Sequence, residues 1–136
     1  GTLAQDRTIA YAYHDASNFA HLYYDNASTK IKFLIRAGGS SVTITSTSTP
    51  VSGTFFQVGV FWTGTNLENG LPAYSMALYF NRALEASGTA SAAMTEAASS
   101  NLDFGSAAGS SQLRGVIRKI HSFQDVFTHT EMTRPI

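Results

Sequence analysis

FAHLYYDNASTKIKFLIR, residues 19–36, contains two alternating runs on either side of a short polar segment. In the second run apolar side chains recur at every other position, a period of two that is typical of a β-strand with one buried face. The residues expected to face inward are Ile31, Phe33 and Ile35, and those expected to face outward are Lys30, Lys32 and Arg36. The polar segment 25–29 lies where a turn is needed, so the stretch predicts a β-hairpin.

The same period of two recurs on both sides of this hairpin. Before it, residues 8–13 alternate, with Ile9, Tyr11 and Tyr13 on one face. After it, strands are expected over residues 42–46, 55–62, 74–80, 83–86, 101–105 and 115–123. Residues 55–62 form the most apolar run, which predicts a central strand covered on both faces. Short strands with turn residues at near-regular intervals indicate an all-β sandwich or barrel.

Three segments depart from the strand pattern. Asn81-Arg82 predicts a two-residue turn, because asparagine tolerates left-handed backbone angles. Residues 87–100 are rich in Ala, Ser and Thr, which favours a loose connection over a helix through residues 92–98. Residues 128–131 match a capping box and predict one short C-terminal helical turn.

The composition narrows the classes of function. The 136 residues contain no internal repeat or linker, as expected of one domain over residues 1–136. Nine Lys and Arg balance nine Asp and Glu, which argues against a nucleic-acid partner that would need a basic surplus. The absence of cysteine excludes disulfides, thiol nucleophiles and cysteine metal sites. No apolar run approaches the roughly 20 residues that span a bilayer. We expect an extracellular, cell-surface or virion location, although the first residues show no signal pattern.

The second half of the chain carries a recognisable order of short motifs. A strand with a late tryptophan, residues 55–62, is followed by residues 77–85, which look like the "l-Y-x-N-G" hairpin of laminin G-like modules. Residues 102–105 are similar to their "l-x-i-G" strand, and residues 115–123 to their "G-x-I-x-x-v-x-i" strand. Residues 127–132 resemble their "l-t-x-x-E-l" turn.

Over residues 8–132 the chain thus resembles the laminin G-like domains of the concanavalin A-like lectin/glucanase superfamily. The resemblance implies a two-sheet antiparallel jelly-roll sandwich. Residues 111–131 also look like domains of this class in phage tail and fibre proteins. Two features depart from the family: Arg82 replaces the usual turn glycine, and the chain is short before Thr8. An absent edge strand would expose backbone groups, so we expect self-association or a place in a larger protein.

The sequence lacks the residue patterns that the enzymes of this fold class require. Glycosidases of this class commonly place their two carboxylates as Glu-x-Asp-x-x-Glu on one strand, but no two acids here lie two positions apart within an expected strand. Residues 55–61 superficially resemble a polysaccharide-lyase strand, yet Phe61 stands where the catalytic tyrosine would be, and the histidine segment follows instead of preceding. Nucleophile-elbow, zinc-protease and P-loop motifs are absent. The four histidines are scattered and are expected at surfaces or strand edges.

A carbohydrate site in a jelly roll usually combines an aromatic ring with amides and carboxylates of nearby loops. The aromatic candidates are Tyr13, Tyr23, Trp62 and Tyr79, and the polar candidates are Asp15, Asn18, Asp25, Asn26 and Asn66. Trp62 is favoured by its place at a strand end beside a Gly/Asn loop. The competing interpretation is that tyrosine and tryptophan in alternating strands belong to the core.

The laminin G resemblance also implies a calcium site built on a loop aspartate. Asp25 with Asn26, or Asp125, is the candidate, although a turn aspartate often only caps its own backbone. No other cofactor is expected. The basic stripe Lys30, Lys32 and Arg36 suits either an acidic glycan or a solvated face. We therefore expect a non-catalytic carbohydrate-binding or adhesion module, with a structural assembly domain as the alternative and a glycoside hydrolase or lyase third. Its partner is a glycan or another protein chain.

Overall fold

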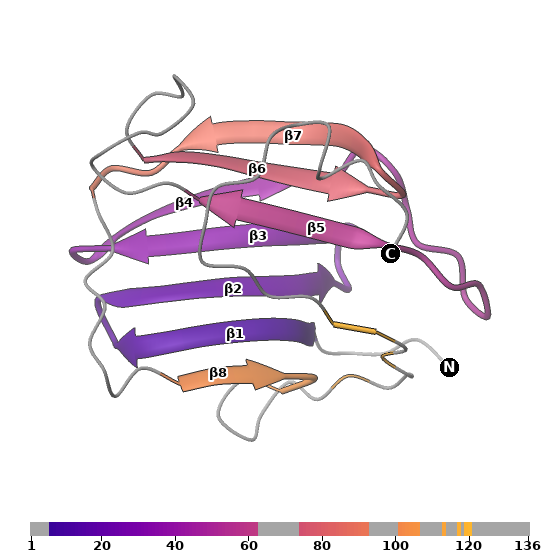
Figure 1. The fold of residues 1–136 in the computed structure, drawn as a ribbon, viewed down its shortest axis with the longest axis horizontal. Coiled ribbons are helices and arrows are strands. Elements are labelled where there is room, and N and C mark those ends of the chain that lie inside the picture. Colours follow the sequence, from indigo (N-terminus) through magenta and orange to yellow (C-terminus); the bar gives the residue numbers. More distant parts are fainter. Residues whose placement is uncertain are drawn as a thin grey trace.

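The computed structural model describes residues 6–62, 74–92, 101–106, 113, 117, 119 and 120. It contains two antiparallel sheets, one of five strands in the order β4-β3-β2-β1-β8 and one of three in the order β5-β6-β7 (Figure 1). The strands are β1 (Arg7–Asp15), β2 (Asn18–Asp25), β3 (Lys30–Ala37), β4 (Ser40–Thr45), β5 (Val58–Trp62), β6 (Ser75–Phe80), β7 (Ala83–Thr89) and β8 (Asn101–Phe104). Within the described part, no helix is long and apolar enough to cross a membrane. This is the all-β, two-sheet sandwich that the sequence predicts.

The predicted hairpin forms the middle of the five-stranded sheet. β2 pairs with β3 over its whole length, from Phe19 opposite Arg36 to Asp25 opposite Lys30. The next turn, Gly38-Gly39, has φ angles of 56° and 85°, which glycine adopts without steric cost. It returns the chain as β4 at one edge of the sheet, while β8 pairs with β1 at the other edge.

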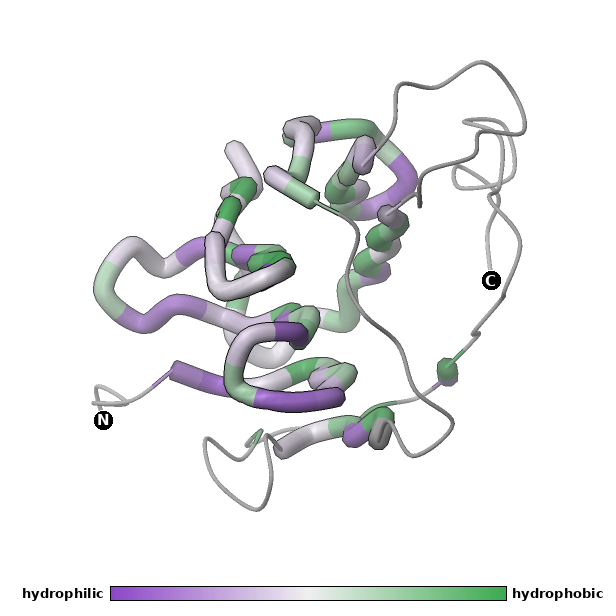
Figure 2. The backbone as a smooth tube through the Cα atoms, turned by 90° about the vertical axis from the view of Figure 1, so that its left-hand side faces the viewer, coloured by the Kyte–Doolittle hydropathy of each residue, from purple (hydrophilic) through white to green (hydrophobic). Residues whose placement is uncertain are grey.

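The core lies between the inner faces of the two sheets, which Figure 2 shows as separate layers viewed along the strands. The predicted inward residues of β3 are buried, with Ile31, Phe33 and Ile35 only 0%, 1% and 1% exposed. From the other sheet, Met76 and Leu78 of β6 complete the same cluster at 1% and 0% exposure. Burial of such side chains stabilises the fold by about 2 kcal/mol each.

Two contacts tie β4 and the segment after it to β7 of the other sheet. A Cβ added at Gly88 would lie 3.0 Å from Cγ2 of Ile44, so the strands approach as closely as a residue without a side chain permits. The backbone N–H of Ser48 donates to Glu85 Oε2 over 2.9 Å, and the Ser48 hydroxyl donates to Glu85 Oε1. The sandwich is thereby closed on the β4 side.

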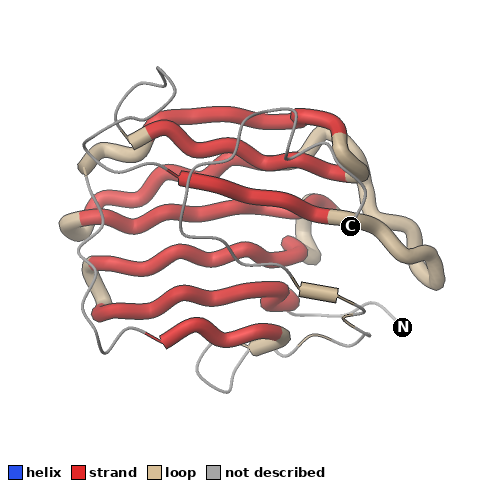
Figure 3. The backbone as a smooth tube through the Cα atoms, in the orientation of Figure 1, coloured by secondary structure: helices blue, strands red, loops and turns tan. Residues whose placement is uncertain are grey.

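The apolar run over residues 55–62 differs from its prediction. β5 begins only at Val58, after a loop that follows β4 (Figure 3). Phe55 lies in this loop with 65% of its surface exposed. The predicted central strand is wrong for the described sheet, because β6 and not β5 lies between two neighbours and is buried on both faces. Period and hydrophobicity predict a strand, but not its place in the sheet.

Several predicted segments lie outside the described residues. These are residues 93–100 of the segment 87–100, which was expected to be a loose connection or a helix, and the C-terminal helical turn over 128–131. Residues 87–89 of the same segment are described and extend β7 to Thr89, so the prediction of a loose connection is wrong there. Of the strand expected over residues 115–123, only Ile117, Lys119 and Ile120 are described, and none of the three is in a strand.

The β6–β7 turn confirms the two-residue prediction at Asn81-Arg82. Both residues have positive φ angles, 46° and 72°, which is the backbone of a type I′ turn. Asn81 also fastens the turn to the start of the three-stranded sheet: its backbone N–H donates to the Gln57 carbonyl over 2.8 Å, and its Oδ1 accepts from the Gln57 N–H over 2.9 Å. Arg82 therefore occupies a position that glycine would fill without strain.

We expect Arg82→Gly to stabilise the domain by about 0.5–1 kcal/mol. Glycine avoids the steric cost that an L-residue has in the left-handed region, and this gain exceeds the larger conformational entropy that glycine gives to the unfolded chain. Urea unfolding of both proteins measures the difference. Arg82→Ala is the matched control, because it removes the side chain but keeps the Cβ, and it should bring no gain. Equal effects of glycine and alanine would contradict the backbone explanation.

Candidate functional site

The outer face of the five-stranded sheet carries a row of rings from β1 and β2. Because the inward positions of these strands hold Ala10, Ala12, Ala20 and Leu22, the intervening residues must point away from the core. These are Tyr11, Tyr13, Phe19, His21 and Tyr23, which we call the outer aromatic surface. Each of the five is half-buried, so part of every ring reaches solvent.

The rings contact one another across and along the strands. Tyr11 is central: its ring centroid lies 5.7 Å from Tyr13, 5.7 Å from Phe19 and 5.1 Å from His21. His21 in turn stacks on Tyr23, with the centroids 4.5 Å apart and the planes inclined by 25°. Such mutual packing limits the motion of each ring and so preorganises the surface.

Charged and apolar side chains continue the surface onto the neighbouring strands. On β3, Lys32 lies opposite Tyr23, Leu34 opposite His21, and Arg36 opposite Phe19. On β8, Asp103 lies opposite Tyr11. Directly opposite residues of antiparallel strands share a face, so an aromatic centre has a cationic side and an acidic side.

His21 is a neutral part of this surface. Its Nε2 lies 2.8 Å from Oγ1 of Thr8, which is completely buried. Burial lowers the pKa of His21 from 6.5 to about 4, although the Asp6 carboxylate acts in the opposite direction. At neutral pH the imidazole therefore carries no charge and packs as an aromatic ring.

Tyr11 and Tyr23 keep their phenol protons to higher pH than usual. Burial raises the pKa of Tyr11, and the phenol of Tyr13 and the carboxylate of Asp103 add to the shift. Burial likewise raises the pKa of Tyr23, against the effect of the nearby Lys32 ammonium. The surface thus offers neutral phenol hydroxyls, which both donate and accept hydrogen bonds.

Asp25, the calcium candidate, is engaged by groups of its own hairpin. Its Oδ2 lies 2.7 Å from Lys32 Nζ, and it accepts from the backbone N–H of Ser28 over 3.1 Å and from the Ser28 hydroxyl. The Lys32 ammonium, followed by the Ser28 hydroxyl, holds the pKa of Asp25 far below its usual range. A cation at this oxygen would have to displace the ammonium.

Neighbouring Asn26 contributes to the same turn through its backbone N–H, which donates to Asp6 Oδ1 over 3.1 Å. In the described ranges, no three His, Cys, Asp or Glu side chains come together as a metal site would require. Asp25 therefore has the backbone-capping geometry that the sequence left as the alternative to metal binding. Asp125 lies outside the described residues, so a calcium site remains a prediction.

The other carboxylates with shifted pKa values are also held by hydrogen bonds. The backbone N–H of Ser17 and the side chain of Asn18 lower the pKa of Asp15. Burial acts to raise the pKa of Glu85, but hydrogen bonds from Ser48 outweigh it, and the pKa is lowered. A glycosidase needs one carboxylic acid whose pKa is raised. The pKa values of Asp15, Asp25 and Glu85 are all shifted in the opposite direction.

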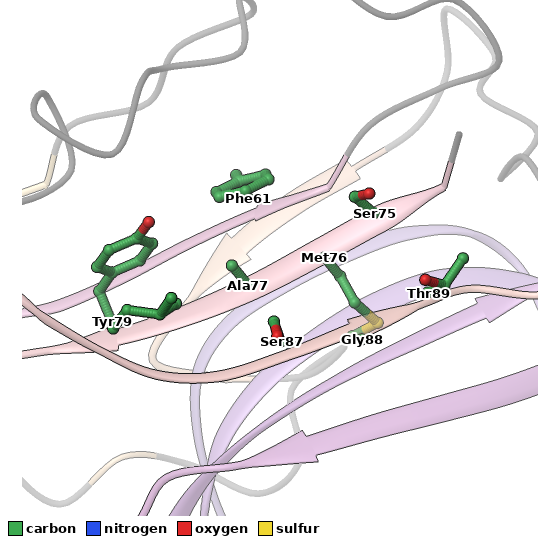
Figure 4. A pocket seen from close by; sticks show the side chains of 9 residues that line it. Phe61, Ser75, Met76, Ala77, Tyr79, Ser87, Gly88 and Thr89 are labelled. Carbon is green, nitrogen blue, oxygen red and sulfur yellow. The ribbon is translucent and has the colours of Figure 1, made fainter. Parts of the chain in front are cut away.

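The remaining sequence candidates lie elsewhere. Trp62 pairs with Met76 and packs its ring 5.7 Å from Phe33 on the inner side of the sandwich, not with the tyrosines. Asn66 lies outside the described residues. Tyr79, 4% exposed, lines a hollow of about 430 Å³ on the other face of the three-stranded sheet with Phe61 and others (Figure 4). The described residues that line this hollow are uncharged, and none of them carries an amide side chain.

The structure thus brings Tyr13 and Tyr23 to one surface, as a shared site requires. They do not contact each other directly: the rings of Tyr11 and His21 lie between them. Tyr11, Phe19 and His21 were not among the sequence candidates for binding. The available signal was the alternation of β2, in which Phe19, His21 and Tyr23 occupy every other position.

The lowered pKa of His21 predicts a pH-dependent stability. Between pH 6.5 and about 4 the unfolded chain binds a proton at His21 that the folded chain does not, so stability falls as the pH is lowered through this window. We expect His21 to account for about 1–2 kcal/mol, reduced for its partial exposure. Urea unfolding at pH 7 and pH 4.5 measures the loss, which His21→Gln should diminish. An equal loss in both proteins would refute this assignment, since the carboxylates contribute identically to each.

Comparison with known proteins agrees with this architecture. The family model described as concanavalin A-like lectin/glucanases superfamily matches residues 2–133, a span that contains every described strand. Neither curated proteins nor solved structures give a match. A match over nearly the whole sequence, together with two antiparallel sheets, shows the family that the motifs predicted. The chain belongs to the concanavalin A-like lectin/glucanase superfamily, as a laminin G-like jelly-roll domain.

Proposed function

We propose that this domain is a non-catalytic carbohydrate-binding module and that its ligand lies on the outer aromatic surface. The observation that carries the proposal is the contiguous set of five half-buried rings on one sheet face. Pyranose rings present apolar C–H faces that pack on aromatic rings. Their hydroxyls pair with side chains such as the phenols of Tyr11, Tyr13 and Tyr23.

Electrostatics support a binding role over catalysis. The described carboxylates with shifted pKa values serve turns and an ion pair, and their pKa values are lowered. Sugar hydrolysis requires a proton donor near neutral pH, which such groups do not supply. The balanced charge of the chain equally disfavours a phosphate backbone as ligand.

The first experiment is a glycan array followed by isothermal titration of each ligand it identifies. We expect Tyr13→Ala and Tyr23→Ala each to weaken binding by about tenfold, the loss of one stacking contact. Leu84→Ala is the matched control, because Leu84 is 48% exposed and lines the hollow on the other sheet. Binding lost in Leu84→Ala but kept in the tyrosine variants would move the site to that hollow.

The same titrations, repeated with a calcium chelator, test whether ligand binding requires calcium. Because Lys32 occupies the Asp25 carboxylate, we expect affinity at the outer aromatic surface to be unchanged by chelation. A chelator-dependent affinity that Asp25→Asn abolishes would instead establish the metal site implied by the family resemblance.

Assembly with other chains is the second candidate function, and one observation favours it. The segment between β4 and β5 projects from the sandwich (Figure 3). Two apolar residues of this segment, Val51 and Phe55, are 67% and 65% exposed. Exposed apolar side chains of this size often mark protein contacts. Sedimentation velocity of the wild type and Val51→Ser separates the two functions: a blank glycan array with an oligomer that Val51→Ser dissociates would favour assembly.

A further inference from the structure

The three cations on the outer side of β3 have different surroundings. Lys30 is engaged by the next segment, where its Nζ donates to the Thr47 carbonyl and, over 2.9 Å, to Thr49 Oγ1. Lys32 is paired with Asp25 over 2.7 Å. Two members of the basic stripe therefore have intramolecular partners, and the third is Arg36.

Arg36 has no carboxylate partner among the described residues. Its Nε is buried without a hydrogen-bond acceptor, although it is a strong donor on a permanent cation. Asp15, next to the Asn18 end of β2, accepts from Ser17 and Asn18, and its Oδ2 lies 3.5 Å from His14 Nε2. A ligand from outside cannot reach this buried Nε, but Arg36 as a whole is only half-buried, and no described carboxylate forms an ion pair with it. Its positive charge is therefore available to an anionic group at the surface.

Arg36 lies at one end of a continuous cross-strand row. It is opposite Phe19 on β2, which is opposite Tyr13 on β1. Adjacent strands are about 4.8 Å apart, so the row spans about 10 Å from the guanidinium-bearing strand to Tyr13. A ligand stacked on the two rings would reach Arg36 at its end.

The sign of the charge changes across the surface. Asp103 lies opposite Tyr11 at the β8 side, whereas Arg36 lies at the β3 side. An anionic group would be repelled from the first position and attracted to the second. The arrangement therefore orients a ligand as well as attracting it.

We propose that the outer aromatic surface binds an acidic sugar, whose ring stacks on Phe19 and Tyr13 while its carboxylate pairs with Arg36. A carboxylate matches the planar guanidinium with two parallel hydrogen bonds, one of the strongest polar contacts that a protein surface makes. The inference rests on the proposed carbohydrate function and adds the chemical class of the ligand: uronic or sialic acid in preference to neutral or sulfated sugars.

The test compares carboxylate sugars with their own methyl esters, which keep the ring and lose the charge. Oligogalacturonate, hyaluronan oligosaccharide and sialyllactose are titrated into the wild type, each beside its ester, with dextran sulfate as the sulfate probe. At least one acid should bind about tenfold or more tightly than its ester and retain its advantage over dextran sulfate. This comparison needs no variant, so it does not depend on the folding of one.

Two variants assign the effect to Arg36. Arg36→Gln should lose about tenfold for the acid and less than about twofold for the ester, after circular dichroism has shown that it folds. Lys119→Gln removes the same charge from an exposed residue and should leave both affinities unchanged. An equal loss in the two variants would show a general charge effect and overturn the proposal.

The outcomes separate this inference from the function on which it rests. If the wild type binds neutral glycans through Tyr13 but gains nothing from a carboxylate, the acidic specificity fails and the carbohydrate function stands. If neither acids, esters nor the array give binding, both fail. If dextran sulfate matches the acids and Arg36→Gln affects them equally, recognition is by charge alone and the carboxylate assignment is wrong.

Discussion

The rest of the structure depends on the burial of alternate β3 residues against the second sheet. Ile31, Phe33 and Ile35 are almost completely removed from solvent, and Phe33 packs against Trp62 of β5. Because side chains of a strand alternate between its two faces, burying one set forces the other set outward. A shift of one residue in register would bring Lys32 into the core, at a cost far above that of any surface contact.

The same alternation in β1 and β2 explains why rings gather on the outside. The inward positions of these strands carry small side chains, alanine at Ala10, Ala12 and Ala20, and the large aromatic groups take the opposite face. Exposed aromatic rings without compensation would invite non-specific association. Here they pack against one another through Tyr11, so only part of each ring remains exposed. A surface of this kind is rigid and amphipathic, which suits the recognition of a sugar ring.

Contacts within the chain decide which charged side chains of this surface keep an unpaired charge. Lys30 and Lys32 are engaged by groups of the chain itself, while Arg36, on the same strand and face, has no carboxylate partner among the described residues. The low pKa of Asp25 follows from its ion pair with Lys32, and that pair holds the turn of the central hairpin. Although the chain has equal numbers of basic and acidic residues, the described part of this surface can therefore still present a positive charge at Arg36.

The sequence alone predicts much of the fold and part of the site. Its period of two predicted the central hairpin and the inward residues of β3, which are buried in the structure. The residues Asn81-Arg82 predicted a two-residue turn, and their positive φ angles confirm it. Hydrophobicity misplaced the start of β5, because Phe55 is apolar yet lies in a projecting segment. Local pattern predicts a strand but contains no information about its neighbours in a sheet.

Tertiary structure decided the features on which the proposed site depends. Tyr13 and Tyr23 were candidates by residue type, whereas their connection through Tyr11 and His21 arises from the pairing of β1 with β2. Equally, the sequence shows three outward cations on β3 without distinguishing them, whereas the described structure gives partners to Lys30 and Lys32 and no carboxylate to Arg36. The physical reason is common to both cases. Alternation along a strand is a local property of the sequence, but the partner of a side chain is set by register between strands and by the path of the loops.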